Sequence, residues 1–343
     1  MKNVLITGGA GFISHHMIYY FIKKTNWNIV SLDRLDYSGN LNRLDNILSQ
    51  LSTQERSRVK IIFHDLKSEI NPWIKKELGE IDIILHLAAG SHVDRSIDYP
   101  MEFVMDNVVG TANILDYARL LNDKKGLDRF IYFSTDEIFG PAPKGVNYKE
   151  NDRYNSTNPY SATKAGGEEL AVAYENTYGL PVYVTHTMNV FGERQHPEKF
   201  IPMCIKKIRD GETITIHSDK TKTIPGTRHY IHAEDVAEAI YFLLTEDIKP
   251  EIDYGGAKCP KFNIVGAEEI NNLDLAQIIA DSQGKELKYE MVDFHSSRPG
   301  HDLRYSLSGE KMKKLGWIPS IKLTQRIKQV VEWSLKNENW IEV

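Results

Sequence analysis

A short apolar strand followed by a glycine-rich turn is the feature that most limits what this chain can fold into. Residues 4–6 are Val-Leu-Ile, which is typical of a buried strand, and residues 8–11 read Gly-Gly-Ala-Gly. Apolar residues recur at helical spacing from Phe12 onward, and residues 28–33 form a second apolar segment. A strand, a glycine turn, a helix and a second strand in this order predict a βαβ unit that binds a dinucleotide.

Glycine in such a turn lets the backbone approach a pyrophosphate, and the following helix offers amide donors and the positive end of its dipole. We therefore predict that Gly8, Gly11, Phe12 and Ile13 contact the cofactor. Asp33 ends the second strand, where a carboxylate meets the ribose hydroxyls and repels the extra phosphate of NADP. The predicted cofactor is NAD. The glycine turn alone would be weak support, since a tight strand-to-helix loop needs glycine anyway.

Alternation of apolar strands and helices continues along the chain. Strand-like segments occur at residues 59–63, 81–86, 130–134 and 181–185, and a helix is predicted over residues 100–121. Repeated β–α alternation predicts an α/β fold with a Rossmann-type, doubly wound parallel sheet.

Small or acidic residues follow two of these strands, at the position where ligands bind in doubly wound sheets. Asp65 and Leu66 follow one strand, and Leu87, Ala88 and Ala89 follow the next. Small residues at a strand end let the backbone lie against a cofactor, although they also relieve crowding. We predict that all five line the NAD site.

The fifth strand ends in a hydroxyl and two adjacent carboxylates, Thr135, Asp136 and Glu137. Asp and Glu are poor strand formers and are costly to bury unpaired, so at the mouth of a sheet they suit proton transfer. A strand that simply stops at a polar loop would look the same. The shared placement with Asp33 and Asp65 at strand ends favours a catalytic site.

A Tyr–Lys pair follows on a predicted helix. Pro159 suits the first helical turn, and Tyr160 and Lys164 are four residues apart, on one face. The nearby ammonium is expected to lower the pKa of the phenol toward neutrality, which would make Tyr160 a base. Such pairs also occur by chance on exposed helices.

Together these motifs resemble the extended short-chain dehydrogenase/reductases and, within them, the nucleotide-sugar 4,6-dehydratases, with the dTDP-glucose enzymes as the nearest type. The likeness runs nearly end to end. Its most specific motifs are residues 135–137 and the Arg-Pro-Gly-His-Asp of residues 298–302. The resemblance implies a lyase, an NAD-dependent NDP-hexose 4,6-dehydratase that converts a UDP- or dTDP-linked glucose-type sugar to the 4-keto-6-deoxy sugar.

The resemblance also implies a role for each catalytic residue. Tyr160 takes the proton of the 4-hydroxyl while the C4 hydride passes to NAD, and Thr135 hydrogen-bonds the forming carbonyl. Lys164 tunes Tyr160 and holds the nicotinamide ribose, so the resemblance implies that Tyr160 and Lys164 also contact the cofactor. Glu137 then removes the acidified C5 proton and Asp136 protonates the departing 6-hydroxyl, before the hydride returns at C6. Elimination needs an acid and a base at once, which neighbouring carboxyls of unlike pKa provide.

A division of the chain is expected as well. Residues 1–187, with 229–247 returning to them, would form the NAD-binding domain, and residues 188–228 and 248–343 a smaller, C-terminal substrate-binding domain. The expected substrate contacts are Ser91, Asn189, Lys199, Phe200, Arg228, Asn263, Arg298 and His301. The family implies a homodimer, joined through the helices that contain residues 100–121 and Tyr160.

Three departures from the family pattern leave the substrate open. Thr215 and His217 stand where proline and tyrosine are usual near the base, so UDP and dTDP both remain candidates. Gly90 replaces a usual glutamate, and we hypothesise that it leaves room for a bulkier C2 group such as N-acetyl. Against this, N-acetylglucosamine dehydratases of the superfamily usually carry lysine at the position of Glu137.

Three alternatives therefore stand beside the leading interpretation: a UDP-N-acetylglucosamine 4,6-dehydratase, with or without 5-epimerase activity; a nucleotide-sugar 4-epimerase; and a non-catalytic, NAD-binding regulatory protein. An epimerase needs the Tyr–Lys pair but has no use for Asp136 and Glu137. A regulatory protein would be expected to have lost the Tyr–Lys pair, which is intact here.

Composition limits the partners. The net charge of −5, with 26% charged residues, does not mark a nucleic-acid or membrane-surface binder.

Cys204 and Cys259 are far apart and form no metal spacing, which indicates a reducing compartment and predicts no metal site. Residues 1–6 lead straight into a strand, and no apolar run approaches the length of a membrane span. We expect a cytoplasmic protein.

Overall fold

A computed structural model of the chain describes residues 1–36, 38–249, 252–253, 256–257, 259–293 and 303–342. The chain forms two compact units. Unit one comprises Met1–Ile138, Tyr154–His186 and Ala237–Phe262, and unit two comprises Phe139–Arg153, Thr187–Val236 and Asn263–Val343. Within the described residues, no helix is both long enough and apolar enough to cross a membrane.

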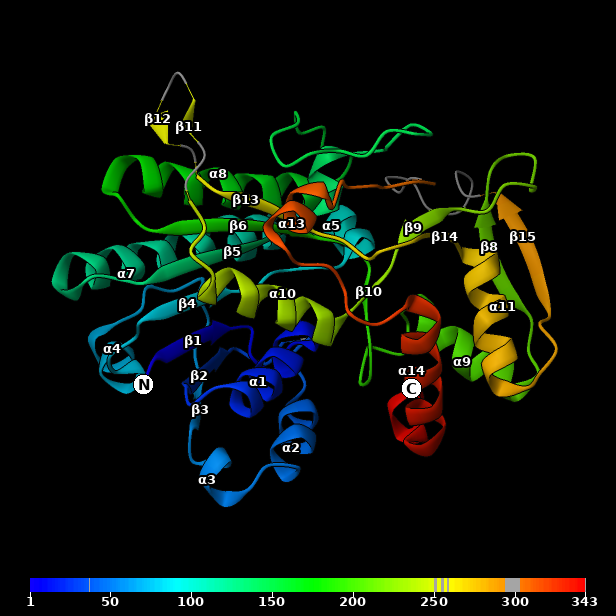
Figure 1. Ribbon diagram of the computed structural model, residues 1–343, viewed down its shortest axis with the longest axis horizontal. Helices are drawn as coiled ribbons and strands as arrows, with labels where there is room; N and C mark the ends of the chain where they lie inside the picture. Colours follow the sequence, from blue (N-terminus) through cyan, green and yellow to red (C-terminus); the bar gives the residue numbers. More distant parts are fainter. Residues whose placement is uncertain (37, 250–251, 254–255, 258, 294–302, 343) are drawn as a thin grey trace. The chain divides into compact units, whose positions relative to one another are not determined.

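A seven-stranded sheet, in the order β13-β6-β5-β4-β1-β2-β3, forms the centre of unit one (Figure 1). Its strands are β1 (Asn3–Thr7), β2 (Asn28–Asp33), β3 (Val59–Phe63), β4 (Ile83–His86), β5 (Arg129–Thr135), β6 (Val182–Thr187) and β13 (Lys261–Ile264). The pairs β1–β2, β2–β3, β1–β4 and β4–β5 are all parallel. Because the chain adds strands on both sides of β1, the predicted Rossmann-type, doubly wound sheet is confirmed.

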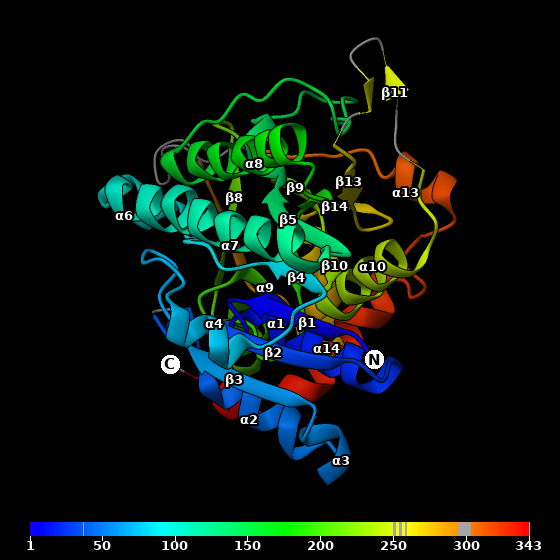
Figure 2. The ribbon, with the colours of Figure 1, turned by 90° about the vertical axis from the view of Figure 1, so that its left-hand side faces the viewer.

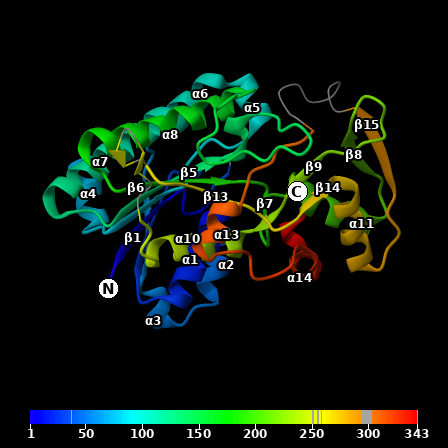
Figure 3. The same ribbon diagram turned by 45° about the horizontal axis from the view of Figure 1, so that its top comes forward.

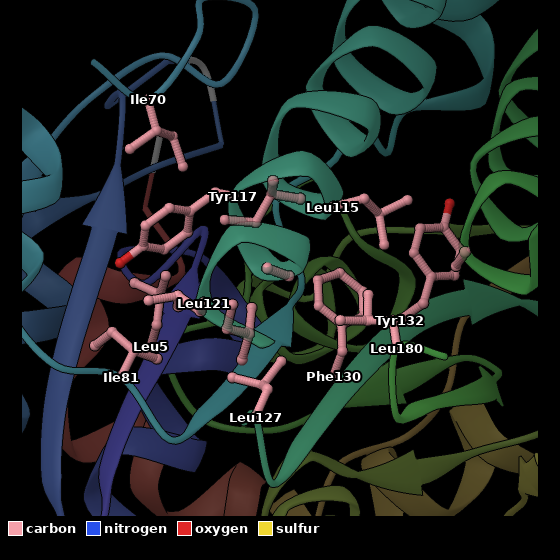
Figure 4. Packing of buried hydrophobic residues seen from close by; sticks show 14 of the residues in the cluster. Leu5, Ile70, Ile81, Leu115, Tyr117, Leu121, Leu127, Phe130, Tyr132 and Leu180 are labelled. Carbon is pink, nitrogen blue, oxygen red and sulfur yellow. The ribbon is translucent and has the colours of Figure 1, made fainter. Parts of the chain in front are cut away.

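Helices cover this sheet and supply its apolar core. They are α1 (Phe12–Lys24), α2 (Leu41–Ser49), α3 (Thr53–Arg56), α4 (Pro72–Leu78), α5 (Val93–Asp98), α6 (Pro100–Val104), α7 (Gly110–Lys125) and α8 (Pro159–Tyr178), with α10 (Ala233–Thr245) running from unit two into unit one. Helices α7 and α8 pack side by side (Figure 2). Figure 4 shows Tyr117 and Leu121 of α7 packed against Leu5 of β1 and Phe130 of β5, all of which are buried.

The helix predicted over residues 100–121 differs from expectation, because a π-helical turn (Met105–Val109) separates α6 from α7. Asn107 in this turn is buried, and its side chain exchanges two hydrogen bonds with the backbone of Gly90, at 2.8 and 3.1 Å. A π turn adds one residue to the helical repeat, which turns this amide toward the loop after β4. Apolar periodicity cannot predict such a turn, since its partner lies elsewhere in the chain.

Three small two-stranded sheets and a helical core make up unit two. The strand pairs are β7 (Val190–Phe191) with β10 (Ile231–His232), β8 (Ile214–Ser218) with β15 (Tyr289–Asp293), and β9 (Thr227–His229) with β14 (Glu269–Asn271). Strands β8 and β15 are parallel (Figure 3). The helices are α9 (Phe200–Asp210), α11 (Asn272–Gln283), α13 (Glu310–Leu315) and α14 (Leu323–Lys336). Ile205, Ile279 and Val331 lie in the core that α9, α11 and α14 share.

The compact units differ from the predicted domain boundaries in three segments and at residue 187. Residues 229–236, predicted to return to the NAD-binding domain, belong to unit two. Residues 139–153 belong to unit two, where the N–H of Tyr148 donates to the carbonyl of Ser306. Residues 248–262 belong to unit one, whose sheet includes β13. None of these segments has a periodicity that assigns it to one unit, so sequence could not place these boundaries. The division into a cofactor domain and a substrate domain stays a prediction.

Gly167 of α8 allows the helix to approach β5 and the π turn closely. A Cβ at position 167 would lie 2.4 Å from the Tyr132 hydroxyl oxygen and 2.6 Å from the Asn107 carbonyl oxygen. At the neighbouring Gly166, the nearest atom, on Val108, would be 3.4 Å away.

We predict that Gly167→Ala lowers the free energy of unfolding by about 1–3 kcal/mol, because overpacking outweighs the better helix propensity of alanine. Gly166→Ala is the matched control, and it should be neutral or stabilising by up to about 1 kcal/mol. Urea unfolding of both variants measures the difference. Equal stability of the two variants would contradict the close packing.

Candidate active site

The turn after β1 is shaped for glycine. Gly8 has a φ of +69°, and a Cβ on it would lie 2.9 Å from the Cα of Ala88. A Cβ on Gly9 would lie 1.9 Å from the hydroxyl oxygen of Ser31. A side chain at either position would displace its neighbours, and α1 begins directly after Gly11. This geometry forms a backbone cradle at a helix N-terminus, which fits a pyrophosphate.

Asp33 lies beside this cradle at the end of β2. Its Oδ2 accepts a hydrogen bond from the N–H of Ala10 at 2.9 Å, and its Oδ1 accepts one from the N–H of Leu35 at 2.7 Å. Burial raises the pKa of Asp33, while the two backbone donors act in the opposite direction. The carboxylate is held in place with acceptor capacity to spare, so it fits the ribose hydroxyls of NAD.

The other predicted cofactor contacts lie on the same unit. Phe12 and Ile13 are half-buried in the first turn of α1, and Asp65 and Leu66 follow β3. The half-buried residues Leu87, Ala88 and Ala89 follow β4. Direct contact of each with NAD stays a prediction.

The three residues that end β5 hydrogen-bond to one another. The Thr135 hydroxyl donates to Asp136 Oδ1 at 3.1 Å and accepts from the N–H of Glu137 at 3.4 Å. Thr135 and Asp136 are each 6% exposed, and Asp136 and Glu137 begin a 3-10 turn (Asp136–Phe139). The strand end therefore presents two carboxyl groups at the carboxyl edge of the sheet.

Asn158 connects this strand end to helix α8. Its side-chain amide donates to Glu137 Oε2 at 3.1 Å, and its side-chain oxygen caps the helix by accepting from the N–H of Ser161 at 2.8 Å. Asn158 was not among the predicted site residues, although an N-cap residue before Pro159 was a usable signal.

Tyr160 has a raised pKa. Burial is the main cause, the charges of Glu137 and Asp136 add to it, and a hydrogen bond with Thr135 opposes it. The prediction that Lys164 lowers this pKa toward neutrality is wrong for this structure. The reason is that burial and two carboxylates disfavour the phenolate more than any neighbour favours it.

Lys164 is buried, with 4% of the residue exposed. Its ammonium donates to the carbonyl of Phe133 and lies 4.4 Å from the centroid of the Tyr132 ring. Burial lowers the pKa of Lys164 to about 7, and the charge of Glu168 opposes this fall. Lys164 can therefore change charge near neutral pH.

A buried hydrogen-bond chain runs from β1 to α8. The Thr7 hydroxyl lies 2.8 Å from His86 Nδ1, and His86 Nε2 lies 3.0 Å from the Thr111 hydroxyl. Thr111 donates to the Asn107 carbonyl at 2.6 Å, and Asn107 Nδ2 donates to the Thr163 hydroxyl at 3.0 Å. Burial lowers the pKa of His86 to about 3, which keeps the ring neutral. Sequence reasoning missed this chain, because its members look like isolated polar residues.

The described substrate candidates lie in both units. Ser91 is exposed in the loop after β4 of unit one, whereas the others belong to unit two. Asn189 has a φ of +41°, Lys199 precedes α9 as its N-cap residue, and Phe200 begins that helix. Arg298 and His301 lie outside the described residues.

Two of these residues make extensive contacts within unit two. Arg228 donates to the carbonyls of Thr227 and Leu303, at 2.7 and 2.6 Å. Asn263 is fully buried, and its amide donates to the carbonyls of Tyr148 and Ser308 at 3.0 and 3.2 Å. Substrate binding by the residues of this set stays a prediction.

Gly90 packs closely against α6 and the π turn, and its hypothesised room for a bulkier C2 group stays a prediction. A Cβ at this position would lie 3.1 Å from two ring carbons of Phe103 and 3.3 Å from Asp106 Oδ2. The Phe103 ring thus occupies the volume that a side chain at position 90 would use.

Comparison with known proteins shows the family to which this chain belongs. The sequence pattern of the family described as GDP-mannose 4,6 dehydratase matches residues 5–330. The chain belongs to the nucleotide-sugar 4,6-dehydratase family. This confirms the predicted relationship, and the match covers both compact units.

Individual members of the family match over nearly the whole chain. A dTDP-glucose 4,6-dehydratase of Escherichia coli is 35% identical over 99% of the chain and 94% of the relative. A trifunctional Arabidopsis thaliana protein, whose activities include UDP-glucose 4,6-dehydratase, is 36% identical over 99% of the chain and 48% of the relative. The crystal structure of a Streptomyces venezuelae dTDP-glucose 4,6-dehydratase with NAD bound has a TM-score of 0.84 and 31% identity, covering 99% of each chain. The predicted enzyme class, the NAD-dependent 4,6-dehydratases, is confirmed.

The buried ammonium of Lys164 predicts a pH-dependent stability. Its folded-state pKa is about 7, against an ordinary value of 10.5, so the unfolded chain binds more protons between these values. The free energy of unfolding of the wild type therefore rises as pH rises through this window. Lys164→Met lacks this rise. In urea unfolding, the wild type should gain stability relative to Lys164→Met between about pH 7 and about pH 10. A difference that does not change with pH would contradict the buried charge.

Proposed function

We propose that this chain is an NAD-dependent NDP-hexose 4,6-dehydratase that acts on a UDP- or dTDP-linked glucose-type sugar. The observation that carries the proposal is the pair Asp136 and Glu137 at the end of β5, linked through Asn158 to the helix of Tyr160. A 4-epimerase would need Tyr160 but not two further carboxyl groups. Family membership supports the same activity.

The chain's own residues would hold the cofactor. We assign the pyrophosphate to the turn at Gly8 and Gly11, the adenosine ribose to Asp33, and the nicotinamide ribose to Lys164. Bound NAD supplies the acceptor for the hydride of C4 and later the donor for C6. Ala88, against which Gly8 packs, would line the same crevice.

The first step removes a proton from the 4-hydroxyl, and we assign it to Tyr160, with Thr135 hydrogen-bonded to the forming carbonyl. The phenolate is disfavoured while both carboxylates are charged. Burial and the charge of Glu137 are the larger causes of this rise in the pKa of Tyr160, and the charge of Asp136 is a smaller one. A protonated Asp136 would therefore lower the pKa of Tyr160 only in part.

The second step is elimination, and the two carboxyl environments suit opposite roles. Asp136 is buried, and a neutral carboxylic acid is less costly to bury than a carboxylate. Glu137 is half-buried and accepts a hydrogen bond from the Asn158 amide, which favours a carboxylate. We therefore assign Glu137 as the base at C5 and Asp136 as the acid at the 6-hydroxyl.

Turnover in heavy water tests the proposal. With UDP-glucose or dTDP-glucose, we expect a 4-keto-6-deoxy product with solvent deuterium at C5, detected by NMR and mass spectrometry. UDP-N-acetylglucosamine is the comparison substrate, and deuterium with inversion at C5 would add a 5-epimerase activity. A C4 epimer that keeps its 6-hydroxyl, or turnover of the acetylated sugar alone, would refute the proposal.

Glu137→Gln should separate oxidation from elimination. The amide cannot take the C5 proton, whereas Tyr160 and Thr135 are unchanged, so we expect bound NADH to accumulate on adding substrate. Dehydration should fall by about 10²–10⁴-fold, the usual contribution of one general base. Absorbance at the NADH band and product formation are measured together. Glu169→Gln, on the exposed side of α8, is the matched control and should behave like the wild type.

We further propose that unit one binds NAD and unit two the nucleotide sugar, and that the protein is a cytoplasmic homodimer. Support for a dimer comes from exposed apolar side chains over α5, α6 and the π turn. These side chains are Ile97, Tyr99, Met101 and Met105. A monomeric mass in sedimentation velocity would contradict the dimer.

A further inference from the structure

Arg34 directly follows Asp33, and its guanidinium contacts acidic side chains from three separate segments. Nη1 and Nη2 donate to the two carboxylate oxygens of Asp106 at 2.5 and 2.7 Å, which makes a bidentate pair. Nε donates to Asp36 at 2.9 Å, and Nη1 lies 3.5 Å from Asp65 Oδ1.

These segments surround the end of β1. Asp36 follows β2, Asp65 follows β3, and Asp106 lies in the π turn, 3.3 Å from where a Cβ on Gly90 would be. Gly90 follows β4, and the sheet order places β1 between β4 and β2. The Arg34–Asp106 pair therefore joins the segment after β2 to the π turn beside the loop after β4, and these two strands flank β1 in the sheet. The end of β1 carries the glycine turn that fits the pyrophosphate.

The geometry gives this pair more weight than most ion pairs near a surface. Such pairs contribute little unless they are bidentate or belong to a network, and this pair meets both conditions. The side chains are 26% exposed for Arg34 and 11% for Asp106, so solvent screens them only in part. Leu35, with a φ of +59°, holds the backbone after Arg34 in a fixed left-handed conformation.

We propose that the Arg34–Asp106 ion pair, by joining the segment after β2 to the π turn, slows release of NAD. The inference rests on NAD binding in the proposed function, but not on dehydration. A 4,6-dehydration returns the cofactor to its starting oxidation state, so one bound NAD serves many turnovers. Slow release then keeps the enzyme active without cofactor in solution.

Asp106→Asn and Arg34→Gln test the bridge. Each protein is loaded with NAD and freed of unbound cofactor, and retained NAD is assayed over time after acid denaturation. We expect both variants to release NAD about three- to tenfold faster than the wild type, and the double variant no faster than either single variant. A simple charge effect predicts opposite changes, since one substitution removes a negative charge and the other a positive charge near an anionic cofactor. That result, or unchanged release, would overturn the inference.

Asp116→Asn is the matched control, because it breaks an exposed Asp–Arg pair with Arg119, 2.7 Å long, on the neighbouring α7. It should release NAD at the wild-type rate. Arg34→Lys keeps the positive charge but loses the bidentate geometry. It serves as a second variant should Arg34→Gln misfold, and it should release NAD faster than the wild type. High salt should speed release from the wild type more than from Asp106→Asn. A wild type that retains NAD without dehydrating sugar refutes only the proposed function, whereas one that binds no NAD refutes both.

Discussion

The parallel pairing of β1 with β2 and β4 is the constraint on which the candidate site depends. Thr7, the last residue of β1, is in register with Leu32 on one side and His86 on the other. As a result, the N–H of Gly8 donates to the Leu32 carbonyl at 2.7 Å, and Gly8 packs against Ala88. A shift of one residue in this register would separate Gly8 from Ala88 and Asp33 from the N–H of Ala10.

Helix α8 is positioned by buried polar contacts, and loss of any of them would leave a donor or acceptor unpaired inside the core. Asn107 joins the π turn to Gly90 and to Thr163 of α8, and Asn158 joins the first turn of α8 to Glu137. Buried amides of this kind stabilise one arrangement strongly, because any other arrangement leaves donors and acceptors unpaired. The same helix carries Tyr160, so these contacts hold Tyr160, Glu137 and the loop after β4 in one arrangement.

Electrostatics in the site follows burial more than spacing along the chain. Tyr160 and Lys164 lie on one helical face, as their spacing predicts, yet the pKa of Tyr160 is raised and that of Lys164 is lowered. Both shifts have burial as their main cause, which no sequence interval encodes. For these two side chains, burial favours the neutral form.

The sequence by itself determined the doubly wound sheet, the glycine turn, the acid at the end of β2 and the paired carboxyls after β5. Each is a local pattern, since strand periodicity, turn chemistry and a strand-end carboxylate are all encoded within a few residues. Only the tertiary structure decided the π turn, the link from Asn158 to Glu137, the Phe103 ring beside Gly90 and the Arg34–Asp106 pair. These features depend on the order in which strands assemble, which brings together residues as far apart as 34 and 106. Such contacts leave no periodic signal, because each partner alone resembles an ordinary surface or helix residue.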